Sequence, residues 1–302
     1  MSRRRRGRRR RVRRRGGGAR PTCAPRVRRE PTRRSRRTST SRHSFDDRPI
    51  DRAAGGTAVT LHGAPSTHLT LDVLTAAGLR HATTTRYCLR TPAGSAPFSV
   101  EARTAISGVE GDAGRVAFAG QVHGAGVVHA AGGGRLGEAD VIVTTTAGQP
   151  LAVVTADCLP IVLYDPARPA LALAHVGWRG TVKGATRAAV EALIALGADP
   201  SRILAAIGPS IGPCCYEVDR VVIDPLVAAF GPVDRWAVPH SDGKWMLDLW
   251  AANEAQLAAS GVARANVHNA RLCTSCRTHL FHSYRRGSRG RLVTLAQMPS
   301  AY

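Results

Sequence analysis

Residues 151–180 read LAVVTADCLPIVLYDPARPALALAHVGWRG and contain three short apolar runs. The runs at 151–155, 161–164 and 171–175 are rich in Val, Ile and Leu. Short runs of this composition, bounded by turn residues, are typical of buried β-strands. This stretch therefore predicts three successive strands.

The pattern outside this stretch alternates further strands with a few helices. After Gly180, apolar residues from Val182 to Leu196 recur at helical spacing, and Gly197 is a plausible stop. Because strands outnumber helices and their connections vary in length, we expect a mixed-sheet sandwich with helices outside. Further helices are expected at 221–230 and 248–259, and further strands at 115–121, 126–130, 141–145, 203–207, 266–270 and 291–297. The strands at 115–121 and 126–130 are expected to pair with each other around the loop that carries His123.

Three side chains that bind soft metals or act as nucleophiles lie at the ends of apolar runs. Cys158 follows the run 151–155, His175 ends the run 171–175, and His123 stands between Val122 and Gly124. Two imidazoles and one thiolate form a three-ligand zinc site with an open position, or a catalytic Cys-His pair. From the residues alone both interpretations stay open.

The neighbours of these residues suggest a polar ligand. Asp157 places an acid beside the thiol, where it can move a proton or orient a neighbour. Arg179, near the start of a predicted helix and between Gly177 and Gly180, suits an anion such as phosphate or carboxylate. Gln121 can hydrogen-bond a polar ligand beside His123.

The net charge of +22 belongs almost entirely to one end of the chain. Residues 1–44 hold 20 Arg and one acid, whereas residues 45–302 carry a net charge of only +3. The basic segment lacks large apolar residues, so we expect residues 1–57 to form a disordered tail and linker before a domain at 58–302. The tail is an electrostatic arm for nucleic acid, a passive tail, an organellar transit peptide or the product of a misassigned start codon.

Composition also bounds the cellular setting and the roles of the cysteines. No apolar run approaches the length of about 18 residues that a membrane span requires, and seven Cys is an odd count. We therefore expect reduced thiols in a cytoplasmic protein. The adjacent Cys214 and Cys215 are a poor chelating pair, because neighbouring side chains on a strand point apart. We therefore expect these two cysteines, together with Cys273 and Cys276, to be structural thiols.

Five short motifs follow one another along the chain. They are Gln-Val-His-Gly at 121–124, Ala-Asp-Cys-Leu-Pro at 156–160, Ala-His-Val-Gly-Trp-Arg-Gly at 174–180, Ile-Gly-Pro-Ser-Ile-Gly-Pro at 207–213 and Ser-Tyr-Arg-Arg at 283–286. In this order they resemble the laccase-domain family, also called YfiH-like proteins, multicopper polyphenol oxidoreductases or peptidoglycan editing factors. The resemblance covers about residues 58–302, and it implies a single-domain, four-layer α/β/β/α fold with His123, Cys158 and His175 as zinc ligands.

The same resemblance implies phosphorolysis of adenosine, inosine, guanosine and methylthioadenosine, with adenosine deaminase activity. Purine nucleosides and phosphate are then the partners, and Arg179, Arg285 and Arg86 are candidates for holding phosphate on charge grounds. Zinc is the expected metal and copper the alternative. We expect a monomer or a small homo-oligomer.

The sequence also bears on the alternative functions of the chain. None of the 11 histidines forms the His-x-His pair common in multicopper oxidases, and the His-x-Glu with Pro-Cys-x-x-Cys signature of zinc nucleobase deaminases is absent. One alternative is a Cys-His hydrolase or amidase of peptidoglycan precursor editing, with Cys158 as nucleophile and His175 as base. The other is nucleic-acid binding through the tail, which the near-neutral remainder of the chain disfavours.

Overall fold

The computed structural model describes residues 56–88 and 115–300, which all lie within one compact unit, Arg37–Tyr302. The predicted Arg-rich tail falls outside the described residues, apart from its last two positions. The first strand begins at Val59.

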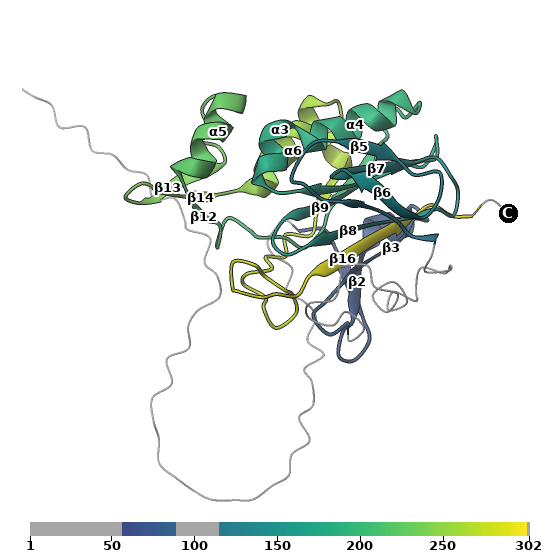
Figure 1. The fold of residues 1–302 in the computed structure, drawn as a ribbon, viewed down its shortest axis with the longest axis horizontal. Helices are drawn as coiled ribbons and strands as arrows, with labels where there is room; N and C mark the ends of the chain where they lie inside the picture. Colours follow the sequence, from purple (N-terminus) through teal and green to yellow (C-terminus); the bar gives the residue numbers. More distant parts are fainter. Residues whose placement is uncertain (1–55, 89–114, 301–302) are drawn as a thin grey trace, which may run out of the picture. The chain divides into compact units, whose positions relative to one another are not determined.

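The larger of two mixed sheets has seven strands (Figure 1). Most neighbours are antiparallel, but β4 runs parallel to β6 and β8. Its strands in spatial order are β1 (Val59–His62), β2 (His68–Leu71), β3 (Arg80–Thr84), β16 (Leu292–Gln297), β8 (Pro150–Thr155), β4 (Ala117–Gly120) and β6 (Gly134–Glu138).

The second mixed sheet has six strands and contains the apolar runs 161–164 and 171–175. The central strands β9 and β10 pair in antiparallel register, while β11–β15 and β5–β7 are parallel pairs. Its strands in spatial order are β15 (Val267–Asn269), β11 (Leu204–Ile207), β9 (Leu159–Asp165), β10 (Ala170–Val176), β7 (Val141–Thr144) and β5 (Val127–His129).

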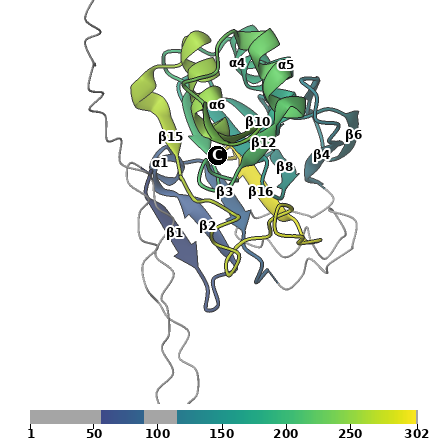
Figure 2. The ribbon, with the colours of Figure 1, turned by 90° about the vertical axis from the view of Figure 1, so that its left-hand side faces the viewer.

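A small antiparallel sheet and the helices complete the described fold. The small sheet has the order β12 (Glu217–Asp219), β14 (Lys244–Leu247) and β13 (Ala237–Ser241). Helices α3, α4 and α6 lie over one face of the six-stranded sheet (Figures 1 and 2). The helices are α1 (Asp72–Ala76), α3 (Trp178–Lys183), α4 (Ala185–Ala195), α5 (Arg220–Phe230), α6 (Leu249–Ala259) and the short 3₁₀ helix η2 (Arg264–Asn266).

The continuous apolar runs of β9 and β10 are explained by burial on both faces. Successive side chains of a strand point to opposite faces of its sheet. Ile161 and Leu163 accordingly pack in the core beneath the helices, whereas Val162 and Tyr164 pack in the core between the two large sheets. A strand in the middle of such a sandwich has no solvent-facing side, so it shows no polar alternation.

The described residues confirm a mixed α/β architecture and most of the predicted strands. The four-layer arrangement stays a prediction, because the described helices form a layer over only one of the two large sheets. The long helix predicted after Gly180 is wrong in one respect: Gly184 adopts φ 78° and divides it into α3 and α4. The left-handed conformation cannot continue a right-handed helix.

The predicted pairing of the two strands around His123 is also wrong. Strand β4 belongs to the seven-stranded sheet and β5 to the six-stranded sheet. The loop between them therefore crosses from one sheet to the other instead of closing a hairpin. Among the described residues, no helix is both long and apolar enough to cross a membrane.

Replacing Leu163 with Ala tests the core between β9 and the helices. Leu163 is fully buried, so we expect Leu163→Ala to lower the free energy of unfolding by roughly 2–5 kcal/mol through lost burial and a residual cavity. Val221 is 68% exposed on α5, and Val221→Ala should change stability by less than about 0.5 kcal/mol. Denaturant unfolding of both variants measures the difference, and equal stabilities would contradict this account of the core.

Candidate metal centre

Two of the candidate ligands lie where the chain crosses between the large sheets. His123 lies in the connection from β4 to β5, and Cys158 lies in the three-residue connection from β8 to β9. His175 is on β10, where it pairs with Pro160, two residues beyond Cys158. The two crossings and the end of β10 thus meet at one edge of the sandwich.

The three side chains are close enough to share one ion. Their ligand atoms all lie within 4.8 Å of one another, and His123 Nε2 is 4.0 Å from Cys158 Sγ. Tetrahedral zinc bonded to one imidazole nitrogen and one thiolate sulfur separates those two atoms by about 3.6 Å. The donor set and spacing therefore fit a zinc ion with three protein ligands.

The buried Asp140 carboxylate holds both histidines in place. Its Oδ1 lies 2.7 Å from His175 Nδ1, which leaves Nε2 of that ring available as a ligand atom. The same carboxylate accepts backbone N–H groups from Val122, His123 and Gly124, at 3.2, 3.1 and 2.6 Å. Carboxylate–histidine pairs of this kind orient metal ligands in proteins.

Electrostatics in this cluster favour a thiolate. Burial raises the pKa of Cys158, but hydrogen bonds and charge from His123 and His175 outweigh it and lower that pKa to about 7. Burial lowers the pKa of His175, but the hydrogen bonds to Asp140 and Cys158 outweigh it and raise that pKa to about 9. A thiolate is the form of cysteine that binds metals and attacks electrophiles.

Asp157 anchors the Cys158 connection to two distant segments. It has φ 86°, an uncommon conformation for a residue other than glycine. Its carboxylate accepts the Thr274 hydroxyl at 2.6 Å, the Ser283 hydroxyl at 3.0 Å and the Arg285 backbone N–H at 2.7 Å. With its oxygens engaged in this way, Asp157 positions the neighbouring thiol.

A cavity of about 730 Å³ opens onto the three ligand residues. Three of its lining residues are arginines, Arg135, Arg179 and Arg291, and within residues 56–88 and 115–300 no Asp or Glu lines it. Arg179 stacks on Trp178 with its guanidinium carbon 4.3 Å from the ring centroid. The cavity therefore combines a candidate metal centre with positive charge, which suits an anionic ligand or co-substrate.

The structure brings only some of the predicted substrate residues to this cavity. Gln121 lines it, but its amide bonds both backbone groups of Val154, at 2.8 and 2.7 Å, and so joins β4 to β8. Arg179 lines it directly. Arg285 lines an adjoining cavity of about 500 Å³ and donates to the Glu217 carbonyl at 2.7 Å. Arg86 lines neither cavity, and its guanidinium donates to the Thr278 carbonyl.

Sequence reasoning missed four residues of this site. Asp140 directly precedes a buried strand, just as Asp157 follows one, so its position could have identified it as a candidate site residue. Arg291 belongs to a Gly-Arg pair close to the Ser-Tyr-Arg-Arg motif. Tyr284 is part of that motif itself. Arg135 carries no comparable signal, because its role depends on which strands and loops meet at the cavity.

Replacing Asp140 with Asn should weaken metal binding. The variant keeps the shape of the side chain but removes the charge that orients and polarises His175, so we expect zinc affinity to fall about 10- to 100-fold. Competition with a chromophoric chelator measures the affinity. The control is Asp224→Asn, since Asp224 is exposed on α5 and far along the chain from the ligands. Equal affinities for Asp140→Asn and the parent protein would contradict the role assigned to Asp140.

Replacing Gly177 with Ala should disturb the ligands sterically. A Cβ at this position would lie 3.0 Å from Cys158 Sγ and 3.2 Å from His123 Cδ2, so both ligands would have to move. We expect less zinc bound per chain after dialysis, with the fold retained by circular dichroism. Gly132→Ala is the matched control, because a Cβ at Gly132 meets nothing within 4 Å. Full zinc content in Gly177→Ala would show that the ligands adjust freely.

Curated relatives of the chain carry enzyme names. A purine nucleoside phosphorylase YlmD of Geobacillus stearothermophilus is 42% identical over 163 residues, which cover 51% of this chain and 58% of the relative. An adenosine deaminase RL5 of an unknown prokaryotic organism is 41% identical over 148 residues, covering 49% of this chain and 56% of the relative. These alignments span less than two thirds of each relative's length.

Solved structures match over more of the chain. YlmD from Geobacillus stearothermophilus superimposes with a TM-score of 0.71 at 30% identity, covering 79% of this chain and 98% of that one. The hypothetical protein YfiH of Bacillus licheniformis gives a TM-score of 0.71 at 26% identity, covering 77% and 96%. The family model described as multi-copper polyphenol oxidoreductase laccase matches residues 93–299, and the chain therefore belongs to this laccase-domain family.

Proposed function

We propose that this chain is a zinc-dependent purine nucleoside phosphorylase that also deaminates adenosine. The observation that carries the proposal is the cavity whose described lining places three arginines beside an open His-Cys-His cluster. Phosphorolysis needs a site for an anion beside a site that activates the nucleoside. The names of two relatives, purine nucleoside phosphorylase and adenosine deaminase, support these two activities.

The metal would be held by His123, Cys158 and His175. Zinc, when bound, supplies a Lewis acid that polarises an oxygen or lowers the pKa of water. Asp140 keeps the His175 ring oriented, and Asp157 keeps the Cys158 connection in its uncommon backbone conformation. Zinc is favoured over copper because blue-copper sites with the same His and Cys donors add an axial Met or Gln. No methionine is among the described lining residues, and the amide of Gln121 is bonded to the Val154 backbone.

In the proposed phosphorolysis the arginines orient phosphate against the ribose. A phosphate oxygen forms a bond to ribose C1′ while the C1′–N9 bond breaks, and the bonding electron pair leaves with the base, which takes up a proton. Arg179, Arg135 and Arg291 would fix the phosphate by charge-assisted hydrogen bonds, so that attack becomes effectively intramolecular. The exposed ring of Tyr284, at the same cavity, offers a face for the purine.

The cysteine hydrolase is the second candidate, and a specific observation favours it. The Cys158 thiol lies beside two imidazoles and has a pKa near neutrality, as an activated nucleophile requires. In that mechanism the thiolate forms a bond to a carbonyl carbon, and the bond to the leaving group breaks as that group takes a proton from His175. Water then hydrolyses the thioester and frees Cys158, so no metal is needed. Hydrolysis that survives complete metal removal and disappears in Cys158→Ser would support the hydrolase and contradict the zinc enzyme.

The direct test is base release from inosine, adenosine and methylthioadenosine with and without inorganic phosphate. We expect phosphate-dependent release by the zinc-loaded protein, ammonia release from adenosine, and loss of both in His123→Ala and after chelation, with recovery on adding zinc. Zinc content and circular dichroism of His123→Ala distinguish a lost metal from a lost fold. Release of no base from any of the three nucleosides would overturn the nucleoside phosphorylase proposal.

Replacing Arg179 with Ala tests the phosphate site. Loss of a charge-assisted hydrogen bond costs about 1.5–3 kcal/mol, so we expect the KM for phosphate to rise roughly 10- to 150-fold while the KM for nucleoside changes far less. Steady-state kinetics with each substrate varied in turn measure both constants. Arg187→Ala is the control, because Arg187 pairs with Glu191 on the exposed face of α4. An unchanged KM for phosphate in Arg179→Ala would remove this residue from the phosphate site.

A further inference from the structure

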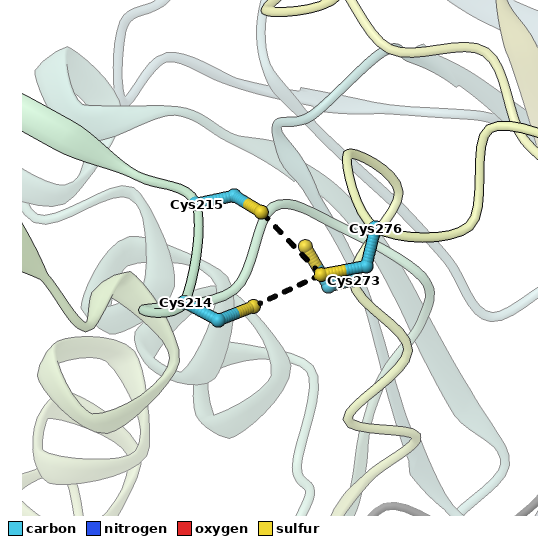
Figure 3. Close-up of side chains that lie close together, drawn as sticks. All are labelled: Cys214, Cys215, Cys273 and Cys276. Carbon is cyan, nitrogen blue, oxygen red and sulfur yellow. Dashed lines mark hydrogen bonds between the residues drawn. The ribbon is translucent and has the colours of Figure 1, made fainter. Parts of the chain in front are cut away.

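Four cysteines outside the candidate metal centre converge on one point (Figure 3). Cys214 and Cys215 lie in the turn between β11 and β12, and Cys273 and Cys276 lie in the loop between β15 and β16. Their four sulfur atoms all lie within 4.8 Å of one another. More than half of the seven cysteines of the chain are therefore gathered in one cluster.

The sheet brings the two segments together. Strands β11 and β15 are parallel neighbours, so the turn and the loop that follow them leave the sheet at the same edge. Beyond the strands, Ser210 N–H donates to the Leu272 carbonyl and Thr274 N–H donates to the Ser210 carbonyl, both at 3.1 Å. The cluster is thus built on backbone hydrogen bonds that continue the strand pairing.

The expectation that Cys214 and Cys215 are a poor chelating pair rested on a wrong premise. They were treated as strand neighbours, whose side chains point apart, but the structure places both in a turn. In this turn both thiols face Cys276, with its sulfur 3.3 Å from that of Cys214 and 3.4 Å from that of Cys215. Figure 3 shows the two side chains reaching toward the same sulfur atom.

The spacing matches a tetrathiolate metal site better than disulfides. A tetrahedral zinc ion with four sulfur ligands sets each sulfur pair about 3.8 Å apart, whereas a disulfide needs about 2.05 Å. The observed separations of 3.3 and 3.4 Å, with all four sulfurs inside 4.8 Å, lie around the first value. None of these four cysteines forms a disulfide.

The surroundings can balance the negative charge of such a site. Four thiolates and one divalent cation carry a net charge of −2. The Gly212 N–H donates to Cys273 Sγ at 3.3 Å, and Arg286 Nη2 lies 3.8 Å from Cys215 Sγ. Arg286 is itself held by Ser275, between the two loop cysteines, through a bond of 2.9 Å from Nε to Oγ.

We propose that Cys214, Cys215, Cys273 and Cys276 bind a second zinc ion, in a closed site that is structural and not catalytic. The four thiols each lose a proton as zinc binds, and four protein ligands leave no position open for a substrate. This site is separate from the His123–Cys158–His175 cluster, and its existence does not depend on the reaction proposed above.

The closed site would hold the loop on which the candidate metal centre depends. Thr274 stands between two of the four cysteines, and its hydroxyl donates to the Asp157 carboxylate at 2.6 Å. Asp157 in turn precedes Cys158 in an uncommon backbone conformation. Zinc bound by the four cysteines would therefore act as a positioning element for the Cys158 connection.

Zinc stoichiometry of the full chain tests the proposal. We expect about two zinc ions per chain in the parent protein and one fewer in Cys276→Ser and in Cys214→Ser, while Cys88→Ser, outside both clusters, keeps both. Cobalt loaded into the Cys158→Ser variant should still give the strong sulfur-to-cobalt absorption of a tetrathiolate site, and Cys276→Ser should lose it. The same zinc content in the parent protein and in Cys276→Ser would overturn the proposal.

A measurement on the parent protein covers the case in which the serine variants do not fold. Alkylation under native conditions, mapped by mass spectrometry, should spare the four cysteines in the zinc-loaded protein and modify them after chelation. Modification at equal rates in both states would overturn the site. A mass two units lower for each cysteine pair would identify disulfides instead, which would also overturn it. Because each readout concerns metal and thiols, its failure is distinguishable from a lack of nucleoside cleavage.

Discussion

The Asp140 carboxylate is the interaction on which the candidate metal centre depends. It binds the His175 ring nitrogen and three consecutive backbone N–H groups of the loop that carries His123. A buried carboxylate is stable only when such partners replace water, and here they come from His175 and from the loop that carries His123. Burial alone would raise its pKa, but the bonds from His175, Gly124 and Val122 outweigh that effect and lower it. The charge that orients the His175 imidazole and holds the loop of His123 is therefore retained throughout the neutral range.

A second buried carboxylate, that of Asp157, holds the connection that carries the third candidate ligand, Cys158. An uncommon backbone conformation costs of order 1–3 kcal/mol and persists only when surrounding contacts determine it. At Asp157 those contacts come from Thr274, Ser283 and Arg285, which are more than 100 residues away along the chain. The thiol is thus placed by the C-terminal loops as much as by the strands around it. Because of this dependence, zinc bound by the four cysteines of the neighbouring loops would also help to position Cys158.

The sequence predicts most of the buried strands, because these depend on local properties, and it singles out the three candidate ligands that the structure brings together. A strand such as β9, buried on both faces, shows an unbroken apolar run, and the ligands stand at the ends of such runs. The crossing of His123 and Cys158 between sheets could not be predicted in this way, since strand pairing is decided by contacts far apart in sequence. Arg86 and Arg135 illustrate the limit: both are arginines, yet only Arg135 reaches the cavity. Charge alone does not indicate which loops meet there.

The ligand chemistry bears on the family's description as copper oxidases. An oxidase of that kind passes electrons among several copper ions held mainly by histidines. Among residues 56–88 and 115–300, only two groups of three or more metal-binding side chains occur, one with two histidines and a cysteine and the other with four cysteines. Neither resembles a histidine-rich copper cluster. The candidate metal position lies beside a cavity whose described lining includes three arginines, and such a lining can hold an anionic co-substrate such as phosphate. The ligand chemistry therefore supports the proposed phosphorolysis over oxidation.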